Sequence, residues 1–102
     1  MNYQITYSKE FRKDIVVIYN DVYRASKEDL IAKNYVKELM QTVHNKLIFP
    51  RSNSRIDLFE EHEVRYFKYK KYKVFYLVKK DEIVVLRALH IARDITKLLE
   101  IE

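Results

Sequence analysis

The chain has 102 residues, 48% of them hydrophobic and 14% aromatic, which is enough to fill the core of one domain spanning residues 1–102. It contains no cysteine and no glycine. This excludes disulfides and thiolate metal sites, and it argues against glycine-rich phosphate loops and dinucleotide-binding motifs. Lys and Arg number 20 against 15 Asp and Glu, a net charge of +5, which favours nucleic acid, the ribosome or an acidic protein as partner.

The sequence also lacks the segments that direct a chain to a membrane. No basic N-terminal region precedes an apolar stretch, and no run approaches the roughly 20 apolar residues of a membrane span. We therefore expect a cytoplasmic protein that does not enter a membrane, and the absence of cysteine fits a reducing compartment. We also expect neither a metal nor a cofactor.

A strand and a helix are predicted first. Apolar and polar residues alternate over Tyr3–Tyr7, as in a strand, and Ser8 is expected to cap a helix from about Lys9 to about Tyr23. Apolar residues spaced by four, three and four form one stripe along this helix, at Phe11, Ile15, Ile18 and Val22.

A second helix is predicted to begin after Ser26, because Ser26-Lys-Glu-Asp29 fits a capping box. Its apolar face holds Tyr35 or Val36, Leu39, Met40, Val43 and Leu47. Pro50 is expected to end the helix, since proline disfavours helical geometry at the preceding residue and cannot donate a backbone hydrogen bond. Two amphipathic helices with a short link predict an antiparallel hairpin that packs on a sheet.

The last third of the chain predicts a meander of three strands. Arg51–Arg55 is expected to be a loop, and Ile56–Glu61 fits either a short strand or irregular chain. Periodicity alone places the strands at about Glu63–Tyr69, Tyr72–Lys79 and Glu82–Leu89, and Ala92–Leu99 is expected to add a short helix or turn. The predicted fold is α+β with the order β-α-α-β-β-β, in which the helical hairpin packs on one face of a twisted antiparallel sheet.

Three segments match a known pattern in order and spacing. They are Ala32–Leu39 leading to Leu47–Pro50, the hairpin from Arg65 to Tyr76, and Leu89-His90-Ile-Ala-Arg93-Asp94. Together they resemble the RelE/ParE superfamily of toxins from bacterial type II toxin-antitoxin systems. The ending, followed by Ile95–Leu99, is particularly similar to the ParE branch. The resemblance implies a small growth-arresting toxin held in check by an antitoxin.

The branch determines the target. ParE-like members inhibit DNA gyrase without cutting nucleic acid, whereas RelE-like members cut mRNA on the ribosome. The resemblance favours a ParE-like gyrase inhibitor, with a RelE-like endoribonuclease as the alternative and a non-toxic binding module of the same fold as a third reading. It also implies a cognate acidic antitoxin and a toxin-antitoxin hetero-oligomer, while the toxin itself is expected to be a monomer or weak homodimer.

Enzymatic activity is expected only if the chain is a RelE-like endoribonuclease. RNA cleavage needs an acid and a base together with cations for the phosphate, roles that His90, Arg65 and Arg93 would fill. This set is incomplete, because RelE-type nucleases carry an arginine where this chain has Lys73, and no tyrosine follows Tyr76 to match their C-terminal tyrosine.

Cations crowd the first two strands of the meander: from Glu63 to Lys80 there are seven Lys and Arg and no acid other than Glu63. The candidates for target binding are Lys68, Lys70, Lys71, Tyr72, Lys73 and Arg93. The three lysines before Tyr72 also fit a solvated hairpin tip that protects a sheet edge. His90 also fits a helix-capping or backbone-bonded structural role, which we favour, and Arg93 also fits an ion pair with Asp94.

Overall fold

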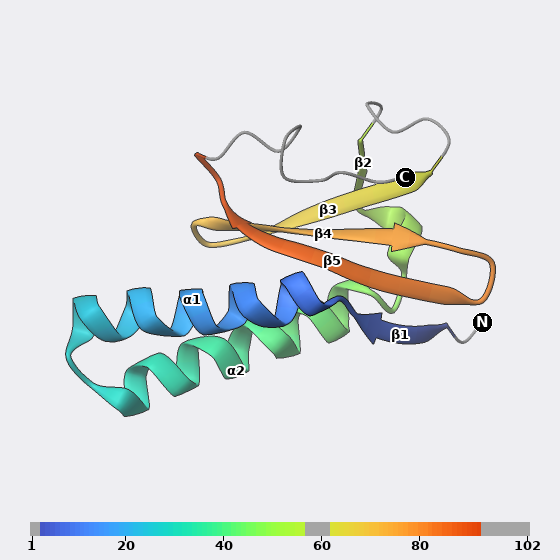
Figure 1. Ribbon diagram of the computed structural model, residues 1–102. Coiled ribbons are helices and arrows are strands. Elements are labelled where there is room, and N and C mark those ends of the chain that lie inside the picture. Colours follow the sequence, from blue (N-terminus) through green and yellow to red (C-terminus); the bar gives the residue numbers. More distant parts are fainter. Residues whose placement is uncertain (1–2, 57–61, 93–102) are drawn as a thin grey trace.

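A computed structural model describes residues 3–56 and 62–92 of the chain. Its elements, in chain order, are β1 (Gln4–Tyr7), α1 (Lys9–Ser26), α2 (Asp29–Lys46), the 3-10 helix η1 (Pro50–Ser52), β2 (Ser54–Arg55), β3 (Glu63–Tyr69), β4 (Tyr72–Val78) and β5 (Glu82–His90). Both helices lie on one face of a five-stranded sheet (Figure 1). The predicted α+β class and helical hairpin are confirmed.

The sheet is mixed, so the expectation of a wholly antiparallel sheet is corrected. Its strand order is β1-β5-β4-β3-β2, and β1 pairs with β5 in parallel, while the other pairs are antiparallel. A parallel neighbour needs a long crossover connection. Here both helices and the strands β2, β3 and β4 lie between β1 and β5 in the chain. The first strand is therefore the neighbour of the last one in the sheet.

The N-terminus of α1 is capped as predicted. The Ser8 hydroxyl accepts a hydrogen bond from the Phe11 backbone N–H at 2.9 Å and donates one to the Leu86 carbonyl at 2.6 Å. The helix runs three residues further than the expected end at Tyr23. Its stripe faces the core, with Phe11 and Ile18 buried.

The capping box expected at Ser26 is wrong. Ser26 is the last residue of α1, and the N-cap of α2 is Glu28, which makes no capping bond with its side chain. The helix ends because Lys27 takes the left-handed conformation, with φ of 63°, and its N–H donates to the Tyr23 carbonyl at 2.7 Å. With no glycine available, a lysine takes this C-cap position.

Ser8→Ala is expected to lower the free energy of unfolding by about 1–2 kcal/mol, because it removes an N-cap that also bonds β5. Ser26→Ala is the matched control, since the Ser26 hydroxyl only accepts from the nearby Glu28 N–H at 3.2 Å and donates to the same residue's carbonyl at 3.3 Å. Urea titration of both variants measures the difference. Equal losses in the two variants would contradict this assignment of the cap.

Pro50 does not itself end α2, which stops four residues earlier at Lys46. Leu47 is the C-cap, and Pro50 instead begins η1, where a missing N–H has no cost. The predicted loop over 51–55 contains part of η1 and the short edge strand β2, which pairs with β3.

The three strands of the meander begin and end within one residue of their predicted bounds. Lys70, in the β3–β4 turn, takes the left-handed conformation with φ of 52°, so the turn forms without the glycine that such geometry favours. Residues 57–61 of the ambiguous segment lie outside the described residues. So do residues 93–99 of the expected last helix or turn.

Each face of the sheet carries its own apolar cluster. The cluster under the helices contains Phe11, Ile18, Leu39, Val43, Leu47, Phe67, Tyr69, Tyr72, Val74, Tyr76, Val78, Ile83, Val85 and Ala88. The cluster on the other face contains Ile56, Val64, Phe75 and Leu89, packed against Tyr66, Leu77 and Leu86. Cross-strand partners lie on the same face, so the register between β3 and β4 assigns the side chains of these two strands to one face or the other.

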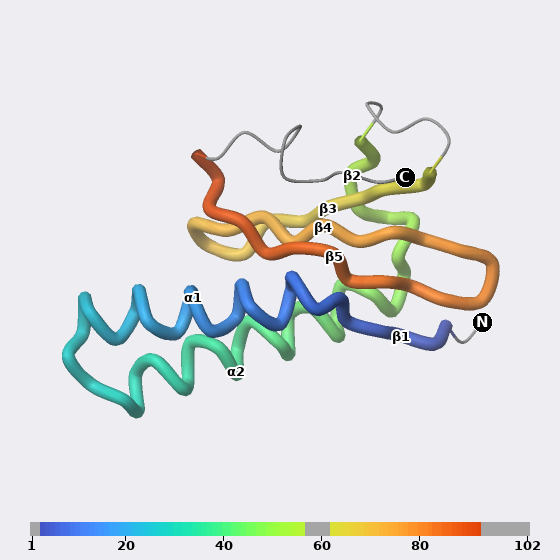
Figure 2. Tube along the Cα trace, in the orientation of Figure 1, coloured from blue at the N-terminus to red at the C-terminus, as the bar shows by residue number. Residues whose placement is uncertain are grey.

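A β-bulge in β5 decides which face its last residues occupy. Phe75 pairs with Arg87 but Tyr76 pairs with Val85, so Leu86 is an extra residue. The Cα trace of β5 shows a step near its middle (Figure 2). An extra residue inverts the alternation beyond it, and His90 therefore pairs with Tyr72 on the helical face.

Candidate functional site

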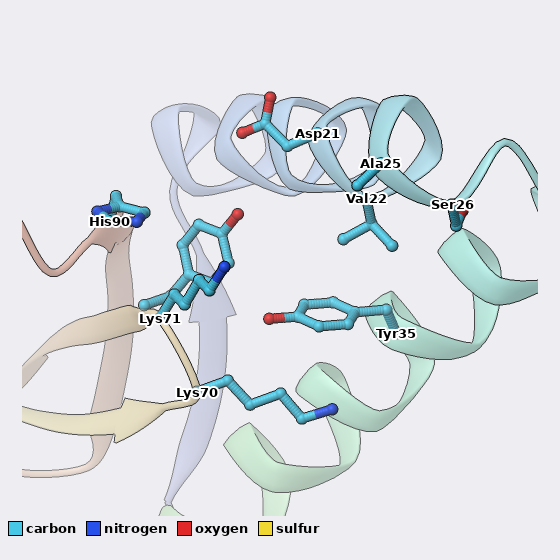
Figure 3. Close-up of a pocket in the computed structure, with 9 residues that line it drawn as sticks. Asp21, Val22, Ala25, Ser26, Tyr35, Lys70, Lys71 and His90 are labelled. Atoms are coloured by element: carbon cyan, nitrogen blue, oxygen red, sulfur yellow. The ribbon is translucent and has the colours of Figure 1, made fainter.

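Four of the predicted site residues meet in one cleft between the helical hairpin and the end of the sheet (Figure 3). They are Lys70, Lys71, Tyr72 and His90. The cleft has a volume of about 610 Å³, and Asp21, Val22, Ala25, Ser26 and Tyr35 complete its lining. No sequence signal singled out these five residues as parts of a site.

The cleft exists because the hairpin is longer than the sheet. The last turns of α1 and the first turns of α2 project past the β3–β4 turn (Figure 1). Val22 and Ala25 of α1 and Tyr35 of α2 therefore form one wall, and the β3–β4 turn with the end of β5 forms the other. The apolar stripes of the two helices continue here beyond the described strands, which cover the rest of the hairpin.

Aromatic rings form the floor of the cleft. The Tyr35 ring packs edge-on against Tyr69 and Tyr72, with centroid distances of 5.5 and 6.3 Å, and Tyr72 packs edge-on against His90 at 5.8 Å. Burial raises the pKa of Tyr35 to about 12, with smaller contributions from Tyr72 and Tyr69. Burial also raises the pKa of Tyr72. Both phenols therefore remain neutral hydrogen-bond donors at physiological pH.

The two turn lysines differ in how they are held. Lys70 Nζ lies 4.8 Å from the Tyr35 ring centroid and 3.8 Å from the nearer Glu38 carboxylate oxygen, so this side chain is fixed against α2. Lys71 is exposed, and its backbone carbonyl accepts from the Ile91 N–H at 2.8 Å. Within the described part of the chain Lys71 makes no ion pair, so its ammonium can reach a ligand in the cleft.

His90 lines the cleft and is also bonded to the backbone. Its Nδ1 accepts a hydrogen bond from the Ala92 N–H at 3.2 Å. Because Nδ1 acts as an acceptor here, Nε2 is the ring nitrogen that can donate. A hydrogen bond of this kind, between the imidazole and the backbone, is what a structural role of His90 predicts.

Arg65 does not lie in the cleft. It pairs with Tyr76, four residues along β4 from Tyr72, a separation of about 13 Å at about 3.3 Å per residue. Its guanidinium donates to the Glu63 carboxylate at 2.8 Å and to the Asn53 carbonyl at 2.6 Å. Burial opposes ionisation of Glu63, but its contacts with Arg65 and Arg51 outweigh burial and lower the pKa.

Lys68 and Lys73 occupy the other face of the sheet. They pair with each other across β3 and β4, and Lys73 pairs with Leu89 of the second apolar cluster. Lys73 Nζ lies 4.9 Å from the centroid of the Tyr66 ring. Arg93 lies outside the described residues. The described candidates thus fall into a group in the cleft and a group on the other face of the sheet, with Arg65 apart from both.

A largely buried ion pair links β5 to α1, and the sequence analysis did not predict it. Arg87 donates to both carboxylate oxygens of Asp14, at 2.8 and 3.0 Å, and the Ala88 N–H donates to Asp14 at 2.9 Å. The hydrogen bond to Asp14 raises the pKa of Arg87 despite partial burial. The available signal was a carboxylate inside an apolar stripe, three residues after Phe11 and four before Ile18.

Comparison with known proteins decides the family. The sequence model of one protein family, described as the ParE toxin of the type II toxin-antitoxin system parDE, matches residues 5–95. The chain belongs to the ParE toxin family. This confirms the predicted ParE-like member of the RelE/ParE superfamily, because the match covers most of the chain.

A solved structure supports the ParE fold. The chain is similar to one described as "Chromosomal ParDE TA system from P. aeruginosa", with a TM-score of 0.70 and 18% identity over 86% of this chain and 95% of that chain. A comparison with curated proteins gives no match. Neither α1 nor α2 is long and apolar enough to cross a membrane, and no group of three or more His, Asp or Glu in residues 3–56 and 62–92 could hold a metal ion.

Proposed function

We propose that this ParE-family toxin arrests growth in the cytoplasm by binding and inhibiting DNA gyrase, and that a cognate acidic antitoxin neutralises it. The observation that carries the proposal is the match to the ParE family model over residues 5–95. The likeness of the Leu89–Leu99 ending to the ParE branch supports the choice of gyrase over the ribosome.

The positions of the nuclease candidates support inhibition by binding. General acid-base cleavage of RNA needs its base, its acid and its cations around one phosphate. His90 lines the cleft, Arg65 lies about 13 Å away along the sheet and is held by Glu63, and Lys73 lies on the opposite face. A RelE-like nuclease would require these three groups to lie around one phosphate, and in the described fold they do not.

Neutralisation by an acidic antitoxin fits the charge and the exposed apolar surface of the hairpin. The large apolar side chains exposed on the two helices are Val16, Val17, Tyr23, Leu30 and Ile31. A disordered acidic segment can fold onto such a surface, offsetting its ordering entropy with a large wrapped interface. The net charge of +5 would speed its association at low salt. In this proposal the free toxin is a monomer or weak homodimer.

Expression of the protein alone in bacteria is expected to stop growth and induce the DNA-damage response, and co-expression of the antitoxin is expected to restore growth. The purified protein should inhibit supercoiling by purified gyrase. Codon-dependent cuts in mRNA on translating ribosomes, with gyrase unaffected, would favour a RelE-like nuclease instead. Normal growth at full expression would favour the non-toxic binding module.

A further inference from the structure

The cleft beside His90 offers a partner an apolar pocket with donors around it. Its volume of about 610 Å³ lies within the roughly 300–1,000 Å³ of typical ligand sites. Val22, Ala25 and the rings of Tyr35 and Tyr72 supply its apolar surface. A large apolar side chain that enters this cleft would extend the core under the helices, which ends here.

The polar groups around this apolar surface are nearly all hydrogen-bond donors. The Tyr35 hydroxyl points from α2 towards the sheet (Figure 3). Neither it nor the Tyr72 hydroxyl makes a hydrogen bond to another described residue, and neither is buried from water. Lys71 Nζ and His90 Nε2 add two more donors. Asp21 is the one carboxylate in the lining. Such a rim fits a ligand that presents carboxylate acceptors.

The local charge favours a peptide over nucleic acid. Binding a sugar-phosphate chain relies on several cations that neutralise successive phosphates. In the cleft Lys70 is already offset by Glu38, so it is not available to neutralise a further phosphate. That leaves Lys71 as the lining cation without an ion pair to another described residue. One carboxylate beside one apolar side chain matches this arrangement.

The size of the cleft favours the target over the antitoxin as its occupant. A stable protein complex buries at least about 1,200 Å² in total, and an antitoxin has the exposed apolar side chains of the helices for this purpose. The cleft accepts one or two side chains, which suits an anchor for a larger, reversible contact. We infer that the cleft is the target-binding site and takes a large apolar side chain from an acidic peptide segment of gyrase. The inference rests on the proposed inhibition of gyrase.

Two substitutions test the cleft, each with a matched control. Ala25→Trp fills the cleft from an exposed helix position, and Asn20→Trp places the same side chain on α1 outside the lining. Lys71→Glu reverses the free charge of the β3–β4 turn, and Lys80→Glu makes the same charge change at the exposed break between β4 and β5. Thermal unfolding and antitoxin affinity of all four proteins report whether the fold is retained.

In a supercoiling assay with purified gyrase, both cleft variants are expected to need about tenfold more toxin for half-inhibition, the usual effect of losing an interface anchor. The two controls should stay within about twofold of wild type. A photo-crosslinking amino acid at position 25 is expected to label a gyrase peptide with Asp or Glu beside an aromatic or branched apolar residue.

The outcomes separate this inference from the proposed function. Wild-type toxin that leaves gyrase active would remove the proposed function itself. If wild type inhibits gyrase and the cleft variants are as potent as their controls, the inference is overturned and the proposed function stands. Cross-linking to DNA, or loss of antitoxin binding with unchanged gyrase inhibition, would also overturn it, since each assigns the cleft to another occupant.

Discussion

The Asp14→Ala variant is expected to lose about 3 kcal/mol of unfolding free energy, because it breaks a largely buried ion pair from one side. Arg87 would lose a bidentate partner, and the buried Ala88 N–H would lose its acceptor. The exposed fractions of the two side chains are 19% for Arg87 and 11% for Asp14, so water can only partly replace the carboxylate. Urea unfolding of the variant measures the loss.

Asp21→Ala is the matched control for this experiment. It also removes an aspartate from the interior of α1, so the gain in helix propensity is the same. The Asp21 side chain is 49% exposed and lies 3.9 Å from Arg24, a geometry that contributes little to stability. The control is expected to stay within about 0.5 kcal/mol of wild type. Similar stabilities of the two variants would show that the ion pair does not stabilise the contact between α1 and β5.

The elements that were predicted well from the sequence are those whose buried residues recur at one regular spacing, that of a helix or that of a strand. The stripe from Phe11 to Val22 on α1 and the alternation along β3 both face a core, so apolar spacing carries the information. Strand ends followed because charged pairs such as Lys70-Lys71 interrupt that alternation. The turn itself could be placed but its geometry could not, since nothing marks Lys70 as a residue with positive φ.

What the sequence did not predict depends on contacts between distant segments. The parallel pairing of β1 with β5 joins residues almost 80 positions apart, and no local pattern specifies it. The bulge at Leu86 is equally hard to predict, because the residues that lead up to it, Ile83–Leu86, are all apolar. That one extra residue moved His90 to the helical face, away from Lys73. In the described fold His90 is therefore separated from Arg65 and Lys73.

Arg51–Arg55 was predicted to be a loop, yet this segment is held by one buried side chain. Tyr76 is fully buried, and its hydroxyl donates to the Pro50 carbonyl and accepts from Asn53 Nδ2, the latter at 2.9 Å. The Asn53 amide also donates to the Lys46 carbonyl at the end of α2, at 3.0 Å. Burial raises the pKa of Tyr76, with opposing and smaller effects of its neighbours, so the hydroxyl stays protonated.

Two substitutions separate the hydroxyl of Tyr76 from its ring. Tyr76→Phe keeps the packing but leaves the Pro50 carbonyl without its donor, and it should lower the free energy of unfolding by about 1–3 kcal/mol. Tyr76→Ala also removes the ring from the cluster under the helices, and a total loss of about 4 kcal/mol is expected. Hydrogen exchange should show faster exchange at Ser54 and Arg55 in Tyr76→Phe while the centre of β4 stays protected. If the hydroxyl holds only the segment between Pro50 and Arg55, faster exchange should be confined to that segment. Loss of protection from exchange throughout the sheet would instead mean that the hydroxyl supports the whole sheet.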